Sequence, residues 1–317
     1  MIQLLILILG LSLLLSLGVI IYLLKKQSSA VNATLNAVSL SNHLSTNHSK
    51  IVGDFYNETT DKFLGVYGEV IQAFRTKNVS DYLDYTIESA ELKDGQTILD
   101  AGCGVGGPAS YFASKLNIDV QGLTISEVQV EKSKTVISSK SLKGNVTIQQ
   151  GDYHQMLSLY GANRFDRILF LESFGHSTHQ IQLIESAYAC LKPGGILYIK
   201  DLFKREHPNA EDGAKIDAII AEINKAYCYN VADFSVIMQT IRRLNFLLLS
   251  VKTPEVKTEE FEHLTISNDF QNLFDIAKIV SWENYVFPID FYEVKVMKPP
   301  FDVNIEKHLY FLNRPNS

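Results

Sequence analysis

The hydrophobic pattern divides the chain into an apolar start, a polar stretch and a long remainder in which apolar runs recur. Residues 1–24 carry no charged side chain. The apolar run from Leu4 to Leu24 is long enough, at about 1.5 Å per helical residue, to cross a hydrocarbon layer about 30 Å thick. We therefore expect residues 1–24 to form a transmembrane anchor. Residues 25–50 are rich in Ser, Asn and Thr, which predicts a flexible linker.

The basic residues that follow the apolar run predict its orientation. Lys25 and Lys26 come directly after it, and basic residues favour the cytoplasmic side of a membrane. We expect a single-pass membrane protein whose remaining domain lies in the cytoplasm. A cleaved signal peptide is the alternative, but it usually has a basic segment ahead of a shorter apolar run.

From residue 51 onward, short apolar runs alternate with amphipathic segments. Strands are expected at 97–100, 119–123, 146–150, 165–171, 195–202, 246–252 and 291–297. Helices are expected at 54–74, 80–90, 108–115, 126–140 and 179–191, and over much of 211–244. This alternation predicts an α/β fold with a doubly wound parallel sheet. Residues 51–317 would then be one domain, with a core over 95–202 and a helical substrate cap with C-terminal strands over 203–317.

Composition and cysteine spacing exclude several classes of function. The 29 basic and 35 acidic residues give a formal net charge of −6, so long-range attraction of a nucleic-acid backbone is not expected. The three cysteines, Cys103, Cys190 and Cys228, stand far apart, which favours a reducing compartment over a disulfide framework. His176 and His179 have no further ligand at a suitable spacing, so we expect no metal site.

A glycine-rich loop follows the first predicted strand of the α/β region. Residues 100–108 (DAGCGVGGP) place an acid at the end of the strand, then Gly102, Gly104 and Gly106, and then a proline that suits the start of a helix. A dinucleotide-binding fold usually has its acid about 20 residues later, and a phosphate-binding P-loop needs a Gly-Lys-Ser/Thr sequence. The loop therefore fits neither the dinucleotide-binding pattern nor the P-loop pattern.

This loop and three later stretches resemble one enzyme group. Residues 99–107 (LDAGCGVGG) resemble motif I of class I S-adenosylmethionine-dependent methyltransferases. Residues 122–129 (GLTISEVQ) and 151–153 (GDY) resemble motifs of the sterol, tocopherol and prenyl (geranyl diphosphate) C-methyltransferases, and residues 191–195 (LKPGG) resemble a common methyltransferase turn, in the same order. The resemblance implies a Rossmann-like methyltransferase fold and S-adenosylmethionine as cofactor.

The resemblance also assigns cofactor contacts to residues of this chain. It implies that the glycine loop approaches the methionine part, that the stretch around Thr124 contacts ribose and adenine, and that Asp152 receives the adenine amino group. The expected cofactor-binding residues are Asp100, Gly102, Gly104, Gly106, Leu123, Thr124, Gln129, Asp152, Tyr153 and Leu171. Gln129 has an alternative role, because Ser126 and Gln129 also have the spacing of a capping box.

A carboxylate and an imidazole follow the fourth strand of the α/β region. Residues 172–176 (ESFGH) resemble the E-[SA]-x-x-H stretch of the same C-methyltransferases. Ligands of open α/β sheets bind beyond the carboxyl ends of the strands, which would put Glu172 and His176 beside the transferred methyl group. Glu172 could stabilise a developing cation and accept a proton, and His176 could orient it or relay the proton. The alternative is a structural role for both.

Aromatic residues before the glycine loop suggest a substrate pocket. Residues 55–58 (FYNE) and 63–68 (FLGVYG) resemble segments that cover the cofactor in the same group. This implies that Phe63 and Tyr67 line the pocket, with the Tyr67 ring facing a cation. These aromatics could equally form the core face of a helix.

Together these features predict a membrane-tethered methyltransferase. The expected acceptor is a hydrophobic prenyl, terpenoid, sterol-like or quinone-like molecule that is methylated on carbon. The chain lacks the Phe-Glu-His-Val-Gly element of cyclopropane synthases, so the resemblance favours simple methylation over ring closure. An O- or N-methyltransferase of a small metabolite is the alternative enzyme, and a scaffold with a degenerate site is the non-enzymatic one.

Overall fold

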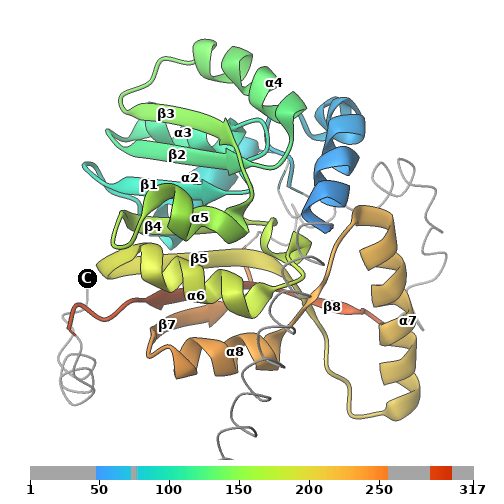
Figure 1. Cartoon of the computed structure of the whole chain (residues 1–317). Coiled ribbons are helices and arrows are strands. Elements are labelled where there is room, and N and C mark those ends of the chain that lie inside the picture. The colour runs from blue at the N-terminus through green and yellow to red at the C-terminus, as the bar shows by residue number, and fades with distance from the viewer. Residues whose placement is uncertain (1–47, 73–75, 77, 256–285, 302–317) are drawn as a thin grey trace, which may run out of the picture. The chain divides into compact units, whose positions relative to one another are not determined.

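The strands form one sheet in the order β3-β2-β1-β4-β5-β8-β7, with β6 paired to β5 (Figure 1). The structure is a computed structural model that describes residues 48–72, 76, 78–255 and 286–301. The expected anchor (1–24) lies outside the described residues, as do most of the linker and much of the C-terminal region. Among the described helices, none combines the length and the hydropathy that crossing a bilayer requires.

The first five strands run parallel, as the alternation of strands and helices predicts. The strands are β1 (Thr97–Ala101), β2 (Asp119–Thr124), β3 (Asn145–Gln150), β4 (Phe165–Leu171), β5 (Leu191–Lys204), β6 (Ala232–Asp233), β7 (Leu247–Lys252) and β8 (Ile289–Met297). β8 pairs antiparallel with both β5 and β7. The doubly wound parallel sheet expected from the sequence is present over β1–β5, and at its edge β8 enters antiparallel between β5 and β7.

Helices cover both faces of the sheet (Figure 1). They are a helix over residues 48–67, α2 (Val79–Ser89), α3 (Gly107–Lys115), α4 (Glu127–Ser138), α5 (Met156–Tyr160), α6 (Gln180–Cys190), α7 (Ala210–Tyr227) and α8 (Phe234–Arg243), with short 3-10 turns at Tyr153–Gln155 and Phe174–His176. Side chains of α5, α6 and α8 pack in the core on one face, and side chains of α2 and α3 pack on the other. Helix 48–67 and α7 lie at the carboxyl end of the parallel strands (Figure 1).

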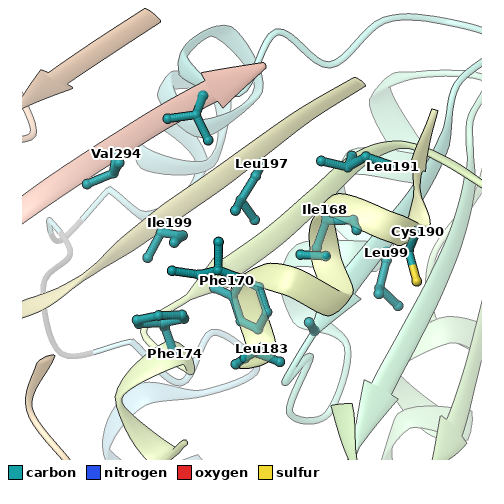
Figure 2. Packing of buried hydrophobic residues seen from close by; sticks show 14 of the residues in the cluster. Leu99, Ile168, Phe170, Phe174, Leu183, Cys190, Leu191, Leu197, Ile199 and Val294 are labelled. Carbon is teal, nitrogen blue, oxygen red and sulfur yellow. The ribbon is translucent and has the colours of Figure 1, made fainter. Parts of the chain in front are cut away.

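The larger core lies between β4, β5 and α6. Figure 2 shows Phe170 and Phe174 close to Leu183 of α6. The rings of Phe170 and Phe174 meet edge to face with centroids 5.5 Å apart, the geometry that the aromatic quadrupole favours. Because β4 is buried on both faces, it forms a nearly continuous apolar run, which explains why the sequence predicts its bounds correctly.

Two segments differ from the sequence expectation for local reasons. The helix expected to run to residue 74 ends at residue 67, because Gly68 adopts a left-handed φ of 64° and its N–H bonds back to the Leu64 carbonyl. The expected turn at 191–195 is part of β5, which shifts register against β4 near Arg167 and has Gly194 at a φ of 79°. The short elements α5 and β6 were not predicted.

Replacing Phe170 with Ala should destabilise the fold by about 3–5 kcal/mol, since a fully buried ring is lost and a cavity remains. Urea denaturation followed by circular dichroism measures the change. Leu248→Ala, at a position on β7 that is 42% exposed, is the matched control and should cost well under half as much. Equal losses for the two variants would contradict the core described here.

Candidate active site

A cleft with an empty volume of about 620 Å³ opens at the carboxyl ends of β1, β2 and β4. It is lined by Ser49, Val52, Tyr56, Ile71, Gly102, Gly104, Thr124, Ile125, Gln129, Gly151, Asp152, Tyr153, His154, Leu171, Glu172, Ser173 and His176. Most of the residues that the sequence nominated for the cofactor, and both nominated catalytic residues, therefore line one cleft. Asp100, Gly106, Leu123, Phe63 and Tyr67 do not line it.

The glycine loop brings backbone to the cleft wall between β1 and α3. Gly102 has a φ of 89°, and a Cβ there would lie 2.4 Å from Cβ of Ser173, so a side chain would collide with the loop after β4. Gly104 has a φ of 56°, and a Cβ there would meet only Ile71 Cδ1, at 4.0 Å. Gly104 thus leaves room at the cleft wall, while Gly106 serves as the N-cap of α3.

Asp100 lies beneath this loop at the end of β1 and is 1% exposed. Burial away from water raises the pKa of its carboxyl to about 7. Its Oδ2 atom is buried and has no hydrogen-bond partner in the described part of the chain. Buried polar atoms usually have a partner, so Asp100 fits a site whose polar ligand completes its hydrogen bonds.

Thr124 at the end of β2 and Gln129 on α4 form a hydrogen-bonded pair. The Thr124 hydroxyl donates a hydrogen bond to Oε1 of Gln129, and the Gln129 N–H donates to the Ser126 hydroxyl at 3.1 Å. Half of the expected capping box is therefore present, while the Gln129 side chain turns to Thr124 instead of closing the box. Leu123 is a core residue whose carbonyl accepts the N–H of Gly102 at 2.8 Å.

Asp152 lies between helix 48–67 and the turn after β3. Its carboxylate accepts the Ser49 hydroxyl at 2.6 Å and the His154 backbone N–H at 2.9 Å, and it lies 2.6 Å from Nδ1 of His154. Burial alone would raise the pKa of Asp152, but the hydrogen bonds from His154 and Ser49 and the charge of His154 lower it. Asp152 therefore presents an ionised carboxylate to the cleft. The neighbouring Tyr153 hydroxyl donates to the Ser173 carbonyl at 3.1 Å.

Glu172 begins the loop after β4 in an unusual backbone conformation. Its φ is 58°, which is uncommon for a residue other than glycine. Its N–H donates to the Lys200 carbonyl at 2.8 Å, and its Oε1 lies 3.7 Å from Nζ of Lys200. Since strained backbone is held only where the surroundings enforce it, the loop geometry supports a functional role for this carboxylate.

The residue after Lys200 on β5, Asp201, holds the same loop in place. Asp201 accepts the backbone N–H groups of Phe174 at 2.8 Å and Gly175 at 3.2 Å, and the Tyr229 hydroxyl donates to its other oxygen. Burial raises the pKa of Asp201 to about 6, against the lowering effect of these hydrogen bonds. The 3-10 turn that carries His176 therefore rests on one buried carboxylate.

His176 is held on both ring nitrogens. Nδ1 lies 3.1 Å from the Cys228 carbonyl oxygen, and Nε2 lies 2.8 Å from the Tyr56 hydroxyl. Because a carbonyl only accepts, Nδ1 donates to the Cys228 carbonyl, and Nε2 shares a hydrogen bond with the Tyr56 hydroxyl. Burial, followed by nearby acids such as Asp201, raises the pKa of Tyr56, which keeps its hydroxyl protonated. His176 thus joins helix 48–67 to the loop after β4.

The two aromatics nominated for a substrate pocket lie behind Tyr56. Phe63 packs against the Tyr56 ring at 5.8 Å between centroids and against the Tyr67 ring at 6.2 Å. Both are buried and belong to an aromatic row along helix 48–67. This is the helix-core arrangement that the sequence analysis kept as the alternative, and Tyr56 is the member of the row that reaches the cleft.

Several residues in the cleft or behind its wall were not nominated from the sequence. Ser49 comes from a helix far away in sequence, and nothing in its local pattern shows that it faces the cleft. Tyr56 belongs to the stretch 55–58 that resembles a cofactor-covering segment, but it was not nominated itself. Lys200 is different, because a charged residue within the apolar strand run ILYIKDLF is a visible signal. His154 follows the GDY motif directly, and its contact with Asp152 is local.

Comparison with known proteins gives a family match and several relatives. The family model described as mycolic acid cyclopropane synthetase matches residues 69–254, more than half of the chain. Methyltransferase GfsG of Streptomyces halstedii is 30% identical over 175 residues, which cover 50% of this chain and 59% of that protein. The 24-methylenesterol C-methyltransferase 2 of Arabidopsis thaliana is 29% identical over 175 residues, covering 53% of this chain and 48% of that protein. The chain thus matches about half the length of these relatives.

A solved structure shares the fold. The geranyl diphosphate C-methyltransferase of Streptomyces coelicolor A3(2), solved with Mg²⁺, geranyl diphosphate and S-adenosyl-L-homocysteine, superposes with a TM-score of 0.59 at 11% identity, covering 79% of this chain and 97% of that one. At this identity the similarity shows the fold alone. The Rossmann-like methyltransferase fold expected from the sequence is confirmed.

Replacing Asp100 with Asn should stabilise the chain at pH 8 by roughly 2–4 kcal/mol and leave it almost unchanged near pH 4. The pKa of Asp100 is raised from 3.8 to about 7 in the folded chain, so the folded state binds this proton more tightly. The wild type therefore loses stability as pH rises from about 4 to about 7, and the variant lacks this loss. Urea denaturation at pH 4 and pH 8 measures it. A variant less stable than wild type at pH 8 would show that the Asp100 carboxylate is not destabilised by burial.

Proposed function

The chain belongs to the mycolic acid cyclopropane synthetase family, and from this we propose that it is an S-adenosylmethionine-dependent methyltransferase that methylates a carbon atom of a hydrophobic acceptor. The relatives support the methyltransferase assignment, and the sterol C-methyltransferases among them support carbon as the methylated atom. The cleft at the carboxyl ends of β1, β2 and β4 is the proposed site of methyl transfer.

The residues present fit S-adenosylmethionine. Bound there, it would supply a methyl group activated by a positively charged sulfur. The unpartnered Oδ2 of Asp100 suits a donor such as the ammonium group of the methionine part. The open backbone at Gly104 leaves room for the cofactor, and Thr124 and the ionised Asp152 suit its ribose and adenine. These carboxylates also favour a positively charged ligand.

Glu172 is the observation that carries the assignment of carbon methylation. When an alkene or electron-rich ring carbon takes up a methyl group, the acceptor becomes positively charged and must then lose a proton. The Glu172 side chain is only 9% exposed, and in such a site a carboxylate stabilises a cation far better than in water. Glu172 would stabilise this charge and take the proton, which restores a neutral acceptor and leaves one methyl group added.

His176 is proposed to hold the site together. Its ring donates to the Cys228 carbonyl and shares a hydrogen bond with the Tyr56 hydroxyl, so both ring nitrogens are already engaged by the protein. We therefore assign it a positioning role in place of a proton relay. Its ring also meets Tyr229 edge to face with centroids 4.5 Å apart, which adds to the packing that fixes the imidazole.

We propose as well that residues 1–24 anchor the protein to a membrane with the catalytic domain in the cytoplasm. The uncharged apolar run and the lysines after it support this. An anchor keeps the enzyme near an acceptor dissolved in lipid and so raises their effective concentration.

The full chain, incubated with S-adenosylmethionine labelled with ¹³C in the methyl group and a lipid extract, should transfer the label to a lipid-soluble acceptor. Mass spectrometry detects the product, and the ¹³C chemical shift identifies the atom that carries the methyl group. We expect a methyl group bonded to carbon. Label on oxygen or nitrogen would establish the alternative O- or N-methyltransferase, and absence of S-adenosylmethionine binding by calorimetry would refute the enzyme assignment.

Replacing Glu172 with Gln should lower the turnover number by about 100-fold or more while leaving the Kd for S-adenosylmethionine within about threefold, because the carboxylate acts on the developing charge. Turnover is measured with the acceptor found above, and Kd by calorimetry. Glu185→Gln, at an exposed position on α6, is the matched control and should keep wild-type turnover. Unchanged turnover in Glu172→Gln would remove Glu172 from the reaction.

Replacing both Leu14 and Leu15 with Arg should release the protein from membranes, since a charge at the middle of a membrane helix costs about 2.5–3.5 kcal/mol or more. Extraction of membrane fractions with alkaline carbonate measures the release. Ser28→Arg with Ser29→Arg adds the same charge to the linker and should leave the protein in the membrane. Release of the wild type under the same conditions would contradict an anchor.

A further inference from the structure

The residue behind Glu172 is a lysine that is completely buried. Lys200 lies on β5 and has 0% exposure. Its Nζ atom lies 3.7 Å from Oε1 of Glu172, donates to the Gln72 amide oxygen and to the Tyr82 hydroxyl, and lies 4.2 Å from the centre of the Tyr82 ring. Glu172 faces the cleft, whereas Lys200 is absent from the cleft lining. The ammonium group therefore acts on the cleft only through its neighbours.

Burying a lysine side chain costs free energy of folding, so a lysine in a core strand needs a physical explanation. Taking a charge out of water disfavours the charged form, and burial lowers the pKa of Lys200 to about 8, with Glu172 and then Glu293 and Asp201 opposing the shift. At neutral pH the side chain is still an ammonium ion. Its two neighbours on the same face of β5 are Tyr198 and Leu202, which carry no charge.

The charged groups around Lys200 come from three neighbouring segments, and their other partners differ. Asp201 binds the backbone of the loop after β4. Glu293, opposite Lys200 on β8, accepts the Tyr85 hydroxyl at 2.9 Å and lies 3.9 Å from Lys252. Glu172 is the acid whose carboxylate lies within 4 Å of the Lys200 ammonium in the described part of the chain.

The backbone holds the pair together as well. The Glu172 N–H donates to the Lys200 carbonyl at 2.8 Å, as part of the last β4–β5 pair, Leu171 and Lys200. The left-handed φ of Glu172 then turns the chain away from the sheet. The same two residues are thus joined by a backbone hydrogen bond and by an ion pair, and the strained turn at Glu172 is held directly against β5.

We propose that Lys200 is a positioning residue for Glu172, holding the Glu172 carboxylate ionised and fixed at the cleft wall. A nearly buried carboxylate with no cation beside it tends to take up a proton. A protonated Glu172 could neither stabilise a positive charge nor accept a proton from the acceptor. The catalytic meaning of this pair rests on the proposed function, while the pairing itself does not.

The titration of Glu172 tests the pairing without any acceptor or cofactor. The full chain is labelled with ¹³C at the glutamate side-chain carboxyl, and its spectrum is followed from pH 4 to pH 9, with Glu172→Gln identifying the Glu172 signal. In Lys200→Met the midpoint of this signal should rise by about one pH unit or more. Lys295→Met removes another lysine of the sheet, paired with Glu91 at 2.8 Å, and should leave the midpoint unchanged. An unmoved midpoint in Lys200→Met would overturn the proposal.

Turnover then tests whether Lys200 acts through Glu172. Lys200→Met should lower the turnover number about 10-fold or more and move the acid limb of the pH profile to higher pH. In the Glu172→Gln background the same substitution should have no further effect. An equal loss in both backgrounds would show a merely structural role. Lack of methyl transfer by the wild type would refute the proposed function alone and leave the titration result standing.

A folding failure is also informative. Removing one partner of a buried ion pair leaves the other charge uncompensated, whereas removing both is often tolerated. If Lys200→Met does not fold, the double variant Lys200→Met with Glu172→Gln should fold, which circular dichroism measures. If neither variant folds, the fold needs Lys200 for its hydrogen bonds to Gln72 and Tyr82, and the proposed role of Lys200 toward Glu172 is wrong.

Discussion

The carboxylate of Asp201 is the group on which the arrangement of the active site depends. It accepts two backbone N–H groups of the loop after β4 and a tyrosine hydroxyl from the segment after α7. A single buried acid on a central strand therefore holds the 3-10 turn Phe174–His176, which follows Glu172 and carries the His176 ring. The residue before Asp201 on β5 is Lys200. The Asp201 side chain therefore binds the backbone of the loop from one face of β5, and the Lys200 side chain forms an ion pair with Glu172 on the other face.

The site also depends on distant pieces of chain. Helix 48–67 places Ser49 on Asp152 and Tyr56 on His176, so one helix contacts both the expected cofactor end and the expected acceptor end of the cleft. The pairing of Tyr56 with His176 joins residues 120 positions apart. The family match begins only at residue 69, so the helix that makes these contacts precedes the matched region, while its partners Asp152 and His176 lie inside it.

Much of the fold and part of the site could be predicted from the sequence. Strands buried on both faces can be predicted from their apolar runs, such as the run from Ile168 to Leu171 in β4, and the glycine loop marks the end of β1. The methyltransferase resemblance, stated from motif I and the stretches after it, is confirmed by the family match. Phe63 and Tyr67 illustrate the limit, because helical periodicity does not say which side of an aromatic row meets a ligand. The antiparallel β8 could not be predicted either, since strand direction follows from connections that periodicity does not describe.

The antiparallel direction of β8 has a consequence for the connections that join the last strands of the sheet. β7 ends at Lys252 opposite Glu293, and β8 begins at Ile289 opposite Lys204. The chain therefore leaves β7 and returns to β8 at the end of the sheet where the cleft lies, and it leaves β5 toward α7 at the same end. The lengths of these connections can therefore change without altering the register of β5, β8 or β7, so this end of the sheet tolerates insertion while the pairing of its strands stays the same.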